Sequence, residues 1–245
     1  MDLKVGVGTD IGRRRSQNQD SVAVVQELGL YIVADGMGGH KGGEIASAIA
    51  VDTITESIRK KGKKRKSDLH HALKEAIEEA SQAIFSRALK EPTLTGMGTT
   101  TTALYFQKNT LCIGQVGDSR CYYKKGSGLW QITRDHSLVQ ERLRAGLITR
   151  DQLKTDQMKN VITRSVGYEQ EVNVELFHMN ISPGDCWMIC SDGLSGLVDD
   201  EQINQILDQK LGSLSDPQQA VHALIEAANQ NGGDDNISAI VIQVC

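Results

Sequence analysis

The chain alternates between short apolar runs of strand length and longer segments whose apolar residues follow helical spacing. Strands are predicted for residues 21–25, 30–34, 99–106, 110–116, 120–123, 129–133, 172–179, 186–191 and 237–244. Apolar residues recur every three or four positions across 45–58, 69–88, 203–211 and 221–228, which predicts helices with one buried face. The polar segment 134–167 is predicted to be helical and exposed.

These predicted elements follow the order strands, helix pair, strands, helix pair and final strand. Strand and helix therefore do not alternate as they do in βαβ units with a parallel sheet. The order favours an α+β fold in which two antiparallel sheets pack together with a helix pair outside each, a four-layer α-β-β-α sandwich. Because no internal repeat or linker divides the chain, residues 1–245 are expected to form a single domain.

Composition is that of an ordinary globular protein. The 245 residues carry 27 Lys and Arg against 31 Asp and Glu, and charged residues make up 24% of the chain, which excludes a disordered or collagen-like protein. No apolar run approaches the roughly 18 residues of a membrane span. The first residues lack the basic start and apolar stretch of a signal peptide, so a cytoplasmic location is expected. We expect a monomer that binds neither nucleic acid nor membranes.

The cysteines predict neither a disulfide framework nor a zinc site. They stand at positions 112, 121, 186, 190 and 245, an odd number without a C-x-x-C pair. Cys186 and Cys190 flank the apolar run 187–189, and no second Cys or His pair lies nearby in the sequence. Packing of these thiols in the core is therefore favoured over half of a zinc site.

Five aspartates fall at the ends of predicted strands. Asp35, Asp118 and Asp192 come directly after apolar runs, whereas Asp20 and Asp235 come just before such runs. Because the end of one antiparallel strand neighbours the start of the next, the five carboxylates are expected at one rim. Like charges there repel and are costly to desolvate, and Mg²⁺ or Mn²⁺ with oxygen ligands would offset that cost. The alternative is that each acidic residue belongs to a simple strand-ending turn.

Short motifs recur along nearly the whole chain. They are Thr-Asp-Ile-Gly at 9–12, Arg-Ser-Gln-Asn-Gln-Asp at 15–20, Val-Ala-Asp-Gly-Met-Gly-Gly-His at 33–40, Gly-Met-Gly-Thr-Thr at 96–100, Val-Gly-Asp-Ser-Arg at 116–120, Thr-Arg-Asp-His-Ser at 133–137, Cys-Ser-Asp-Gly-Leu at 190–194 and Gly-Asp-Asp-Asn at 233–236. In type and order they resemble the motifs of the metal-dependent protein phosphatases of the type 2C family, bacterial branch. The resemblance implies a central β-sandwich flanked by helices and an enzyme that hydrolyses phosphoserine and phosphothreonine in proteins.

The resemblance also implies a role for most of the acidic residues. Asp35 would bridge two Mn²⁺ or Mg²⁺ ions, Gly36 would offer its carbonyl oxygen, and Asp192 and Asp235 would complete the shell of one ion. Asp20 would act near the second ion through water. Two ions about 3.5–4 Å apart acidify a bridging water, and the resulting hydroxide attacks phosphorus in line without a covalent intermediate.

Two residues are candidates for contact with the substrate. Arg15 matches the family's phosphate-binding arginine, three residues before Asn18, and a guanidinium can hold two phosphate oxygens. The alternative is a solvated basic cluster formed with Arg13 and Arg14. His40 follows a glycine-rich turn and could protonate the leaving oxygen as a general acid, or it could simply tie that loop in place.

Two further expectations concern Asp118 and the segment that resembles the family's flap. Asp118, with Asp192, would hold a third and weaker ion, although from the residues alone it could equally orient Arg120 or a metal-bound water. The flap, residues 146–167, is expected to form a small subdomain. Asp156 stands where the family usually has a histidine, so no substrate or metal role of that histidine is expected here.

Partners follow from the same resemblance. It implies phosphorylated proteins as substrates, including a Ser/Thr kinase. The basic run 59–66 is interpreted as a solvated loop between two helices, with an anionic partner as the alternative. The glycine-rich segments do not match nucleotide-binding motifs. Residues 6–12 miss the dinucleotide-binding pattern G-x-G-x-x-G by one residue, and no strand is predicted before them. Residues 36–43 lack the Lys-Ser/Thr ending of a P-loop. A phosphatase-fold binding module without turnover is the second function class, and the complete set of acidic candidates favours an enzyme.

Overall fold

Two antiparallel sheets form the centre of the structure, a computed structural model that describes residues 2–38, 42–62, 68–153, 156–212 and 216–245. The first sheet has the strand order β1-β11-β10-β7-β8, and the second has the order β2-β3-β5-β6-β9 with β4 paired to β3. The strands of the first sheet are β1 (Leu3–Asp10), β7 (Arg120–Lys125), β8 (Gly128–Gln131), β10 (Cys186–Cys190) and β11 (Ile237–Val244). Those of the second are β2 (Asp20–Val25), β3 (Leu30–Met37), β4 (Gly98–Thr99), β5 (Thr101–Gln107), β6 (Thr110–Val116) and β9 (Glu175–Asn180).

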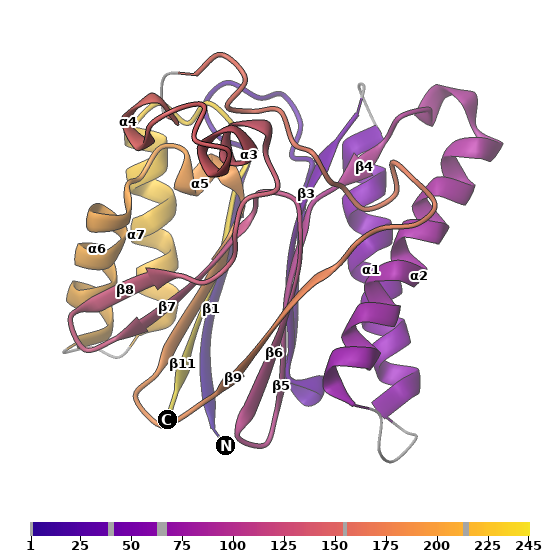
Figure 1. Ribbon diagram of the computed structural model, residues 1–245. Coiled ribbons are helices and arrows are strands. Elements are labelled where there is room, and N and C mark those ends of the chain that lie inside the picture. Colours follow the sequence, from indigo (N-terminus) through magenta and orange to yellow (C-terminus); the bar gives the residue numbers. More distant parts are fainter. Residues whose placement is uncertain (1, 39–41, 63–67, 154–155, 213–215) are drawn as a thin grey trace.

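Helices cover the outer face of each sheet. In Figure 1, α1 and α2 lie against the second sheet, and α6 and α7 lie against the first, so the four-layer α-β-β-α prediction is confirmed. The long helices are α1 (Gly42–Gly62), α2 (Leu69–Lys90), α6 (Asp200–Gly212) and α7 (Pro217–Gln230). The shorter ones are α3 (Leu138–Arg144), α4 (Arg150–Leu153) and α5 (Asp192–Ser195), with 3-10 turns at Gln26–Leu28 and Pro92–Leu94. Over the described part of the chain, every helix is too short or too polar to cross a bilayer.

Capping residues set where two of the long helices begin. The Asp68 side chain accepts a hydrogen bond from the His70 N–H at 3.2 Å ahead of α2. Asp216 accepts from the Gln218 N–H at 3.0 Å ahead of α7, where Pro217 occupies the first helical position. Each cap satisfies an N–H group that has no partner inside its own helix. The starts of α2 and α7 are therefore encoded locally in the sequence.

Strand β3 is buried on both faces. Its Leu30 and Ile32 belong to the apolar cluster beneath α1 and α2, whereas Tyr31 and Val33 fill the space between the two sheets. Successive strand residues point to opposite faces, so burial on both sides requires a continuous apolar run rather than alternation. This rigid strand leads directly to Asp35.

The first strand, β1, was not predicted. Leu3, Val5 and Val7 do alternate with other residues at a strand period of two, but lysine and glycines between them weaken the signal. Gly6 is required by packing, since a Cβ there would lie 2.2 Å from the Pro217 carbonyl oxygen of α7. The glycine-rich start of the chain is thus a strand packed closely against a helix. The expectation that no strand stands before residues 6–12 was wrong, since β1 begins at Leu3.

The segment 134–167 is mostly irregular, which corrects the helical prediction. Helix is confined to α3 and α4, and few apolar side chains, among them Val139 and Ile148, are buried there. A segment with so few apolar residues has no continuous face to pack, so backbone hydrogen bonds to neighbouring loops hold it instead. The predicted strand 172–179 likewise begins only at Glu175.

All five cysteines are free thiols. Four of them, Cys112, Cys121, Cys186 and Cys190, are buried, and Cys245 is exposed. Burial raises the pKa of Cys112, Cys186 and Cys190 to about 12. Packing of Cys186 and Cys190 in the core is confirmed, and neither thiol has the acidity of a nucleophile.

Candidate metal centre and active site

Five aspartates gather where strands of both sheets end at one side of the molecule, and we refer to them together as the acidic rim. Asp20 and Asp35 are directly paired across β2 and β3. Asp118 follows β6, Asp192 opens α5 after β10, and Asp235 precedes β11. The carboxyl group of Asp35 interacts with those of Asp20, Asp118 and Asp192, and Asp20 also interacts with Asp235. The structure therefore brings all five predicted acids together.

Burial and mutual repulsion raise the pKa values of carboxyl groups in the acidic rim. Burial, followed by the charges of its acidic neighbours and a hydrogen bond that protonated Asp35 donates to Asp192, raises the pKa of Asp35 well above its ordinary value. Burial is also the largest cause that raises the pKa of Asp20 to about 6, and burial with the charge of Asp192 raises the pKa of Asp118 to about 8. Without a cation, part of this rim holds protons near neutral pH.

The rim fits a hard divalent cation. One oxygen of Asp20, Oδ1, is buried without a hydrogen-bond partner. The available ligands are carboxylate oxygens, the set that Mg²⁺ and Mn²⁺ prefer, and a cation would relieve their repulsion. Among the residues that the structure describes, no group of three His, Cys, Asp or Glu side chains already surrounds a single point as metal ligands do. The donor chemistry of the rim, carboxylate oxygens with one buried and unpartnered, therefore suits a divalent cation, although the side chains do not surround a common point.

Two threonines fix the backbone of Asp35. The Thr100 N–H donates to the Asp35 carbonyl at 2.8 Å, and the Asp35 N–H donates to Thr100 Oγ1 at 3.0 Å. The Thr99 hydroxyl donates to the same carbonyl at 2.8 Å, and Ser119 Oγ lies 2.7 Å from Thr100 Oγ1. Because Thr100 bonds to Asp35 in this way, the predicted strand 99–106 is divided into β4 and β5.

The glycines that follow two of the aspartates allow other backbone segments to approach closely. A Cβ on Gly36 would lie 2.0 Å from the Gly43 carbonyl oxygen at the start of α1. A Cβ on Gly193 would lie 2.0 Å from the Asn236 carbonyl oxygen ahead of β11. Both Asp-Gly pairs are therefore sites of tight packing, and the interpretation as simple strand-ending turns does not account for them.

Asn236 joins three segments of the rim. Its side-chain amide donates to the carbonyls of Ile11 at 2.9 Å and Gln17 at 3.0 Å, and its Oδ1 accepts from the Gln19 N–H at 2.8 Å. The buried Ser191 hydroxyl donates to Asp20 Oδ2 at 2.8 Å. These bonds hold the loop before β2 against the starts of β11 and α5.

Arg15 is the arginine that reaches the acidic rim. Its Nη2 lies 2.6 Å from Asp235 Oδ2, whereas Arg14 Nε pairs with Asp234 Oδ1 at 2.8 Å, outside the five rim residues. The interpretation of Arg15 as part of a merely solvated cluster is therefore disfavoured. His40 lies outside the described residues, so its role stays a prediction.

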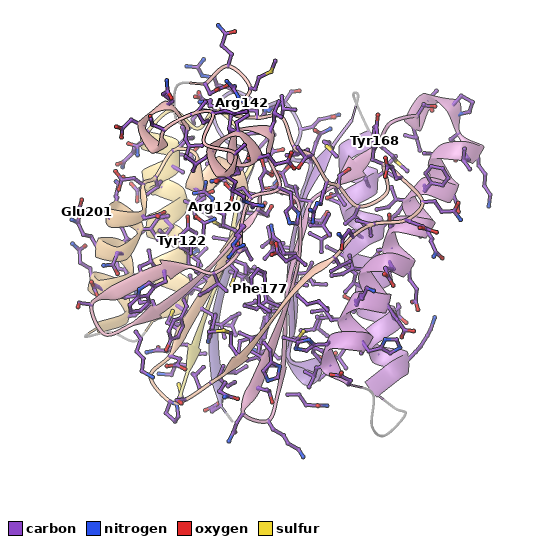
Figure 2. The ribbon with its side chains drawn as sticks, in the orientation of Figure 1. Arg120, Tyr122, Arg142, Tyr168, Phe177 and Glu201 are labelled. Carbon is purple, nitrogen blue, oxygen red and sulfur yellow. The ribbon has the colours of Figure 1, made fainter. Side chains whose placement is uncertain are left out.

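Arg120 is oriented by Asp135 rather than by Asp118. Its Nε lies 3.0 Å and its Nη2 2.7 Å from the two oxygens of Asp135, a bidentate ion pair below the rim; Figure 2 labels Arg120 on β7. His136 Nδ1 accepts from the Gly117 N–H at 3.1 Å, which fixes the backbone immediately before Asp118. Of the two alternatives to a metal role for Asp118, orienting Arg120 is therefore disfavoured.

Asp156, which stands in the place of the family's histidine, has a structural role in the flap. Its Oδ2 accepts from Arg142 Nη1 at 2.6 Å, and its Oδ1 accepts from the Met158 N–H at 2.9 Å. The C-terminal end of the flap is joined to β4 by two backbone hydrogen bonds between Thr99 and Val166, at 3.0 and 2.8 Å. Since β4 pairs with β3, the flap is connected to the strand that carries Asp35.

Five polar residues that hold the site were assigned no role from the sequence. They are Thr99, Thr100, His136, Ser191 and Asn236. Each lies inside a motif that pointed to the family, and His136, Ser191 and Asn236 also stand directly beside an aspartate, which is the signal that could have identified them. Their contacts are between residues far apart in sequence, so spacing along the chain could not reveal the partners.

Comparisons with known proteins agree with this geometry. The family model described as protein phosphatase 2C matches residues 7–228. The chain belongs to this family. The phosphatase is 36% identical over 239 residues to serine/threonine phosphatase stp of Listeria welshimeri, covering 96% of this chain and 93% of the relative. It is 34% identical over 243 residues to serine/threonine protein phosphatase PstP of Mycobacterium tuberculosis, covering 99% of this chain and 45% of PstP.

Solved structures give the same result. The crystal structure of the Mycobacterium tuberculosis phosphatase PstP/Ppp superposes with a TM-score of 0.90 at 34% identity, covering 99% of this chain and 98% of that chain. The catalytic domain of PstP in complex with two manganese ions superposes with a TM-score of 0.88 at 34% identity, covering 99% of each chain. This chain is therefore a metal-dependent serine/threonine protein phosphatase, and the fold and activity implied by its motifs are confirmed.

The metal-free phosphatase should lose stability as the pH rises. The pKa values of Asp20, about 6, and Asp118, about 8, lie above the ordinary 3.8, so the folded protein binds more protons than the unfolded chain between these limits. By linkage, the free energy of unfolding falls as the pH rises from about 4 to about 8, by at most about 1.4 kcal/mol per pH unit for each group. Urea unfolding in EDTA at several pH values measures this fall.

Asp118→Asn should show a smaller fall than the wild type, and saturating Mn²⁺ should flatten the dependence in the wild type. The exposed Asp52 of α1 provides the matched control, since Asp52→Asn should behave as the wild type. Equal slopes in the Asp118→Asn variant and the wild type would contradict the raised pKa of Asp118.

Proposed function

We propose that the acidic rim is the catalytic centre of the phosphatase, with Asp35 as the ligand shared by two divalent ions. The convergence of the five carboxylates carries this proposal. Asp192 and Asp235 would complete the shell of one ion together with the Gly36 carbonyl, and Asp20 would act toward the other through water. When bound, such ions supply Lewis acidity that makes water nucleophilic and withdraws charge from the phosphoryl group.

The surrounding residues position this centre. Thr99 and Thr100 fix the Asp35 backbone, so its carboxylate projects from a strand end that cannot shift. Ser191 occupies one oxygen of Asp20 and leaves the other, Oδ1, for water or metal. A rigid arrangement of this kind lowers the cost of organising charged groups around a phosphorus centre.

Arg15 is proposed to hold the phosphate of the substrate. It lies within an ion-pair distance of 2.6 Å from Asp235, so a phosphate bound by its guanidinium would sit beside the rim. Its side chain is half-exposed, which leaves it free to exchange this partner for phosphate oxygens. His40 is proposed to protonate the leaving serine or threonine oxygen, and the raised pKa values of the four buried thiols agree with attack by water.

Asp118 is proposed to hold a third ion together with Asp192. Its charge and that of Asp192 repel each other within the rim, and a cation held by both would relieve that repulsion. Asp156 is paired with Arg142 of α3, so this flap acid offers little help to such an ion. The third ion should therefore bind more weakly than the other two.

Phosphorylated proteins are the substrates of a serine/threonine protein phosphatase, and we propose a Ser/Thr kinase among them. We also propose that the protein is a cytoplasmic monomer that does not bind nucleic acid, with residues 1–245 as one domain and 146–167 as its flap subdomain. Part of the basic run 59–66 lies outside the described residues. Its first member, Arg59, forms ion pairs with Glu56 and, at 3.4 Å, with Glu27, which fits a solvated helix end.

Hydrolysis should depend on Mn²⁺ or Mg²⁺ and on Asp35. We expect the protein to hydrolyse an aryl phosphate and a phosphothreonine peptide with added Mn²⁺, and EDTA to abolish both activities. Asp35→Asn should lower kcat by at least about a thousandfold, since one ligand serves both ions. Asp52→Asn should keep wild-type kcat. Full activity in EDTA would refute the metal mechanism, and no turnover under any metal would favour the binding module instead.

Removal of Arg15 should weaken binding of the phosphate. Arg15→Ala loses a charged, two-point contact, so KM should rise by about tenfold or more in steady-state kinetics. Arg14→Ala is the matched control, because Arg14 pairs with Asp234 and should change KM little. A larger effect of Arg14→Ala would show that the two arginines were assigned in the wrong order.

Asp118→Ala should remove only the weak ion. Calorimetric titration with Mn²⁺ should give two tight sites in both proteins and a third, weak site in the wild type alone. Asp151→Ala, a change of an exposed flap acid, should keep the third site. Identical stoichiometry and Mn²⁺ dependence in wild type and Asp118→Ala would rule out a metal role for Asp118.

A further inference from the structure

A groove of about 480 Å³ opens beside the acidic rim. One wall is formed by Met37 and Gly38, the residues that follow Asp35 and Gly36 at the end of β3. The opposite wall is the chain segment that leaves the flap and leads to β9. Since a strand advances about 3.3 Å per residue, Met37 lies about 7 Å beyond Asp35, and the groove begins next to the proposed catalytic centre.

The groove carries charges of both signs. Arg164 lies toward the rim, because the N–H of the preceding Thr163 donates to the His136 carbonyl at 2.7 Å, and the His136 ring accepts from the Gly117 N–H directly before Asp118. Glu169 lies against α2, where its carbonyl oxygen accepts a hydrogen bond from Ser81 at 2.9 Å. A phosphorylated segment would therefore meet positive charge on the His136 side and negative charge on the α2 side.

Two carboxylates of the groove are available to a ligand. Glu169 and Glu171 both line the groove and are exposed. Within the described part of the chain, neither side chain takes part in an ion pair. The two carboxylates thus give this part of the groove a negative charge that no described residue pairs.

The remaining lining suits the stem of a long cationic side chain. Ile162 and Val172 give the groove apolar surface, and Tyr168 is 60% exposed on the loop that Figure 2 shows passing near β4. Lysine and arginine pack their methylene stems on apolar surface while their charged ends stay near water and acids. An aromatic ring such as that of Tyr168 also attracts a nearby cation.

We propose that this groove binds a Lys or Arg side chain of the phosphoprotein substrate through Glu169, Glu171 and Tyr168. The inference rests on the proposed function, because it places the phosphate at the acidic rim. An extended peptide also advances about 3.3 Å per residue, so the basic residue should stand about two to four positions from the phosphorylated one. The groove thus makes the phosphatase selective for phosphorylation sites that carry a nearby basic residue.

The test compares phosphothreonine peptides that differ in a single residue. An alanine-rich parent peptide is compared with a set in which one Arg occupies each position within about four residues on either side of the phosphothreonine. With saturating Mn²⁺, the best Arg peptide should exceed the parent in kcat/KM by about three- to tenfold, the size expected for partly exposed ion pairs. Added salt should reduce that ratio, because it screens the charges.

Variants identify the groove as the cause. The ratio should approach one in the double variant Glu169→Gln with Glu171→Gln, and Glu171→Lys should shift the preference toward a peptide with Asp at the same position. The control is Glu201→Gln on α6, in the opposite helix layer, which should keep the wild-type ratio.

Equal kcat/KM for all peptides, a wild-type preference for Asp, or an unchanged ratio in the double variant would each overturn the groove proposal. The proposed function is tested separately by wild-type hydrolysis of an aryl phosphate, which carries no neighbouring residues. Hydrolysis of the aryl phosphate without any Arg preference would leave the catalytic centre standing and reject the groove. No hydrolysis of any substrate with Mn²⁺ would instead reject the catalytic centre.

Discussion

Repulsion among buried carboxylates is the constraint on which the site depends. Asp20 and Asp35 are paired across neighbouring strands, and Asp192 lies close enough to share a hydrogen bond with Asp35. Without a cation, such a cluster keeps protons or separates, and both responses cost stability. The fold holds the cluster together by placing each acid within or beside a strand of the sandwich, and β3, β6, β10 and β11 are largely buried. The apolar sandwich thereby supports the position of charges that would otherwise move apart.

A second set of interactions couples the two sheets at this rim. Asp35 belongs to one sheet, while Asp192 and Asp235 adjoin strands of the other. Asn236 and Ser191 bridge the gap with hydrogen bonds to the segment before β2 and to Asp20 itself. Buried polar networks of this kind fix relative positions well, because each unsatisfied group would be costly. Hydrogen bonds therefore set the distance between the acids of the first sheet and those of the second. The apolar core between the sheets only brings the two sheets together.

Sequence reasoning succeeded where local pattern and tertiary structure agree. The run 30–34 is apolar throughout because β3 is buried on both faces, and the helical spacing of 69–88 and 221–228 marks the buried faces of α2 and α7. It failed for β1, where Gly6 and its neighbours serve packing against α7 and obscure the strand pattern. The aspartates could be predicted to converge, since strand ends meet in an antiparallel sheet. The partners of Asn236 could not, because they lie about two hundred residues away in sequence and no local rule connects them.

The acidic rim and the groove beside it differ in how firmly they are packed. The acidic rim stands on buried strand ends, where a change in backbone position would disturb a close-packed core. The flap and the loop that follows it bury few apolar side chains and are joined to the core by short bridges, such as that between Thr99 and Val166. Side chains on such a segment can change without loss of the core, so residues such as Tyr168 and Glu171 are free to differ while the acidic rim stays fixed. A phosphatase built in this way can keep one reaction and alter the sequence around the phosphoresidue that it accepts.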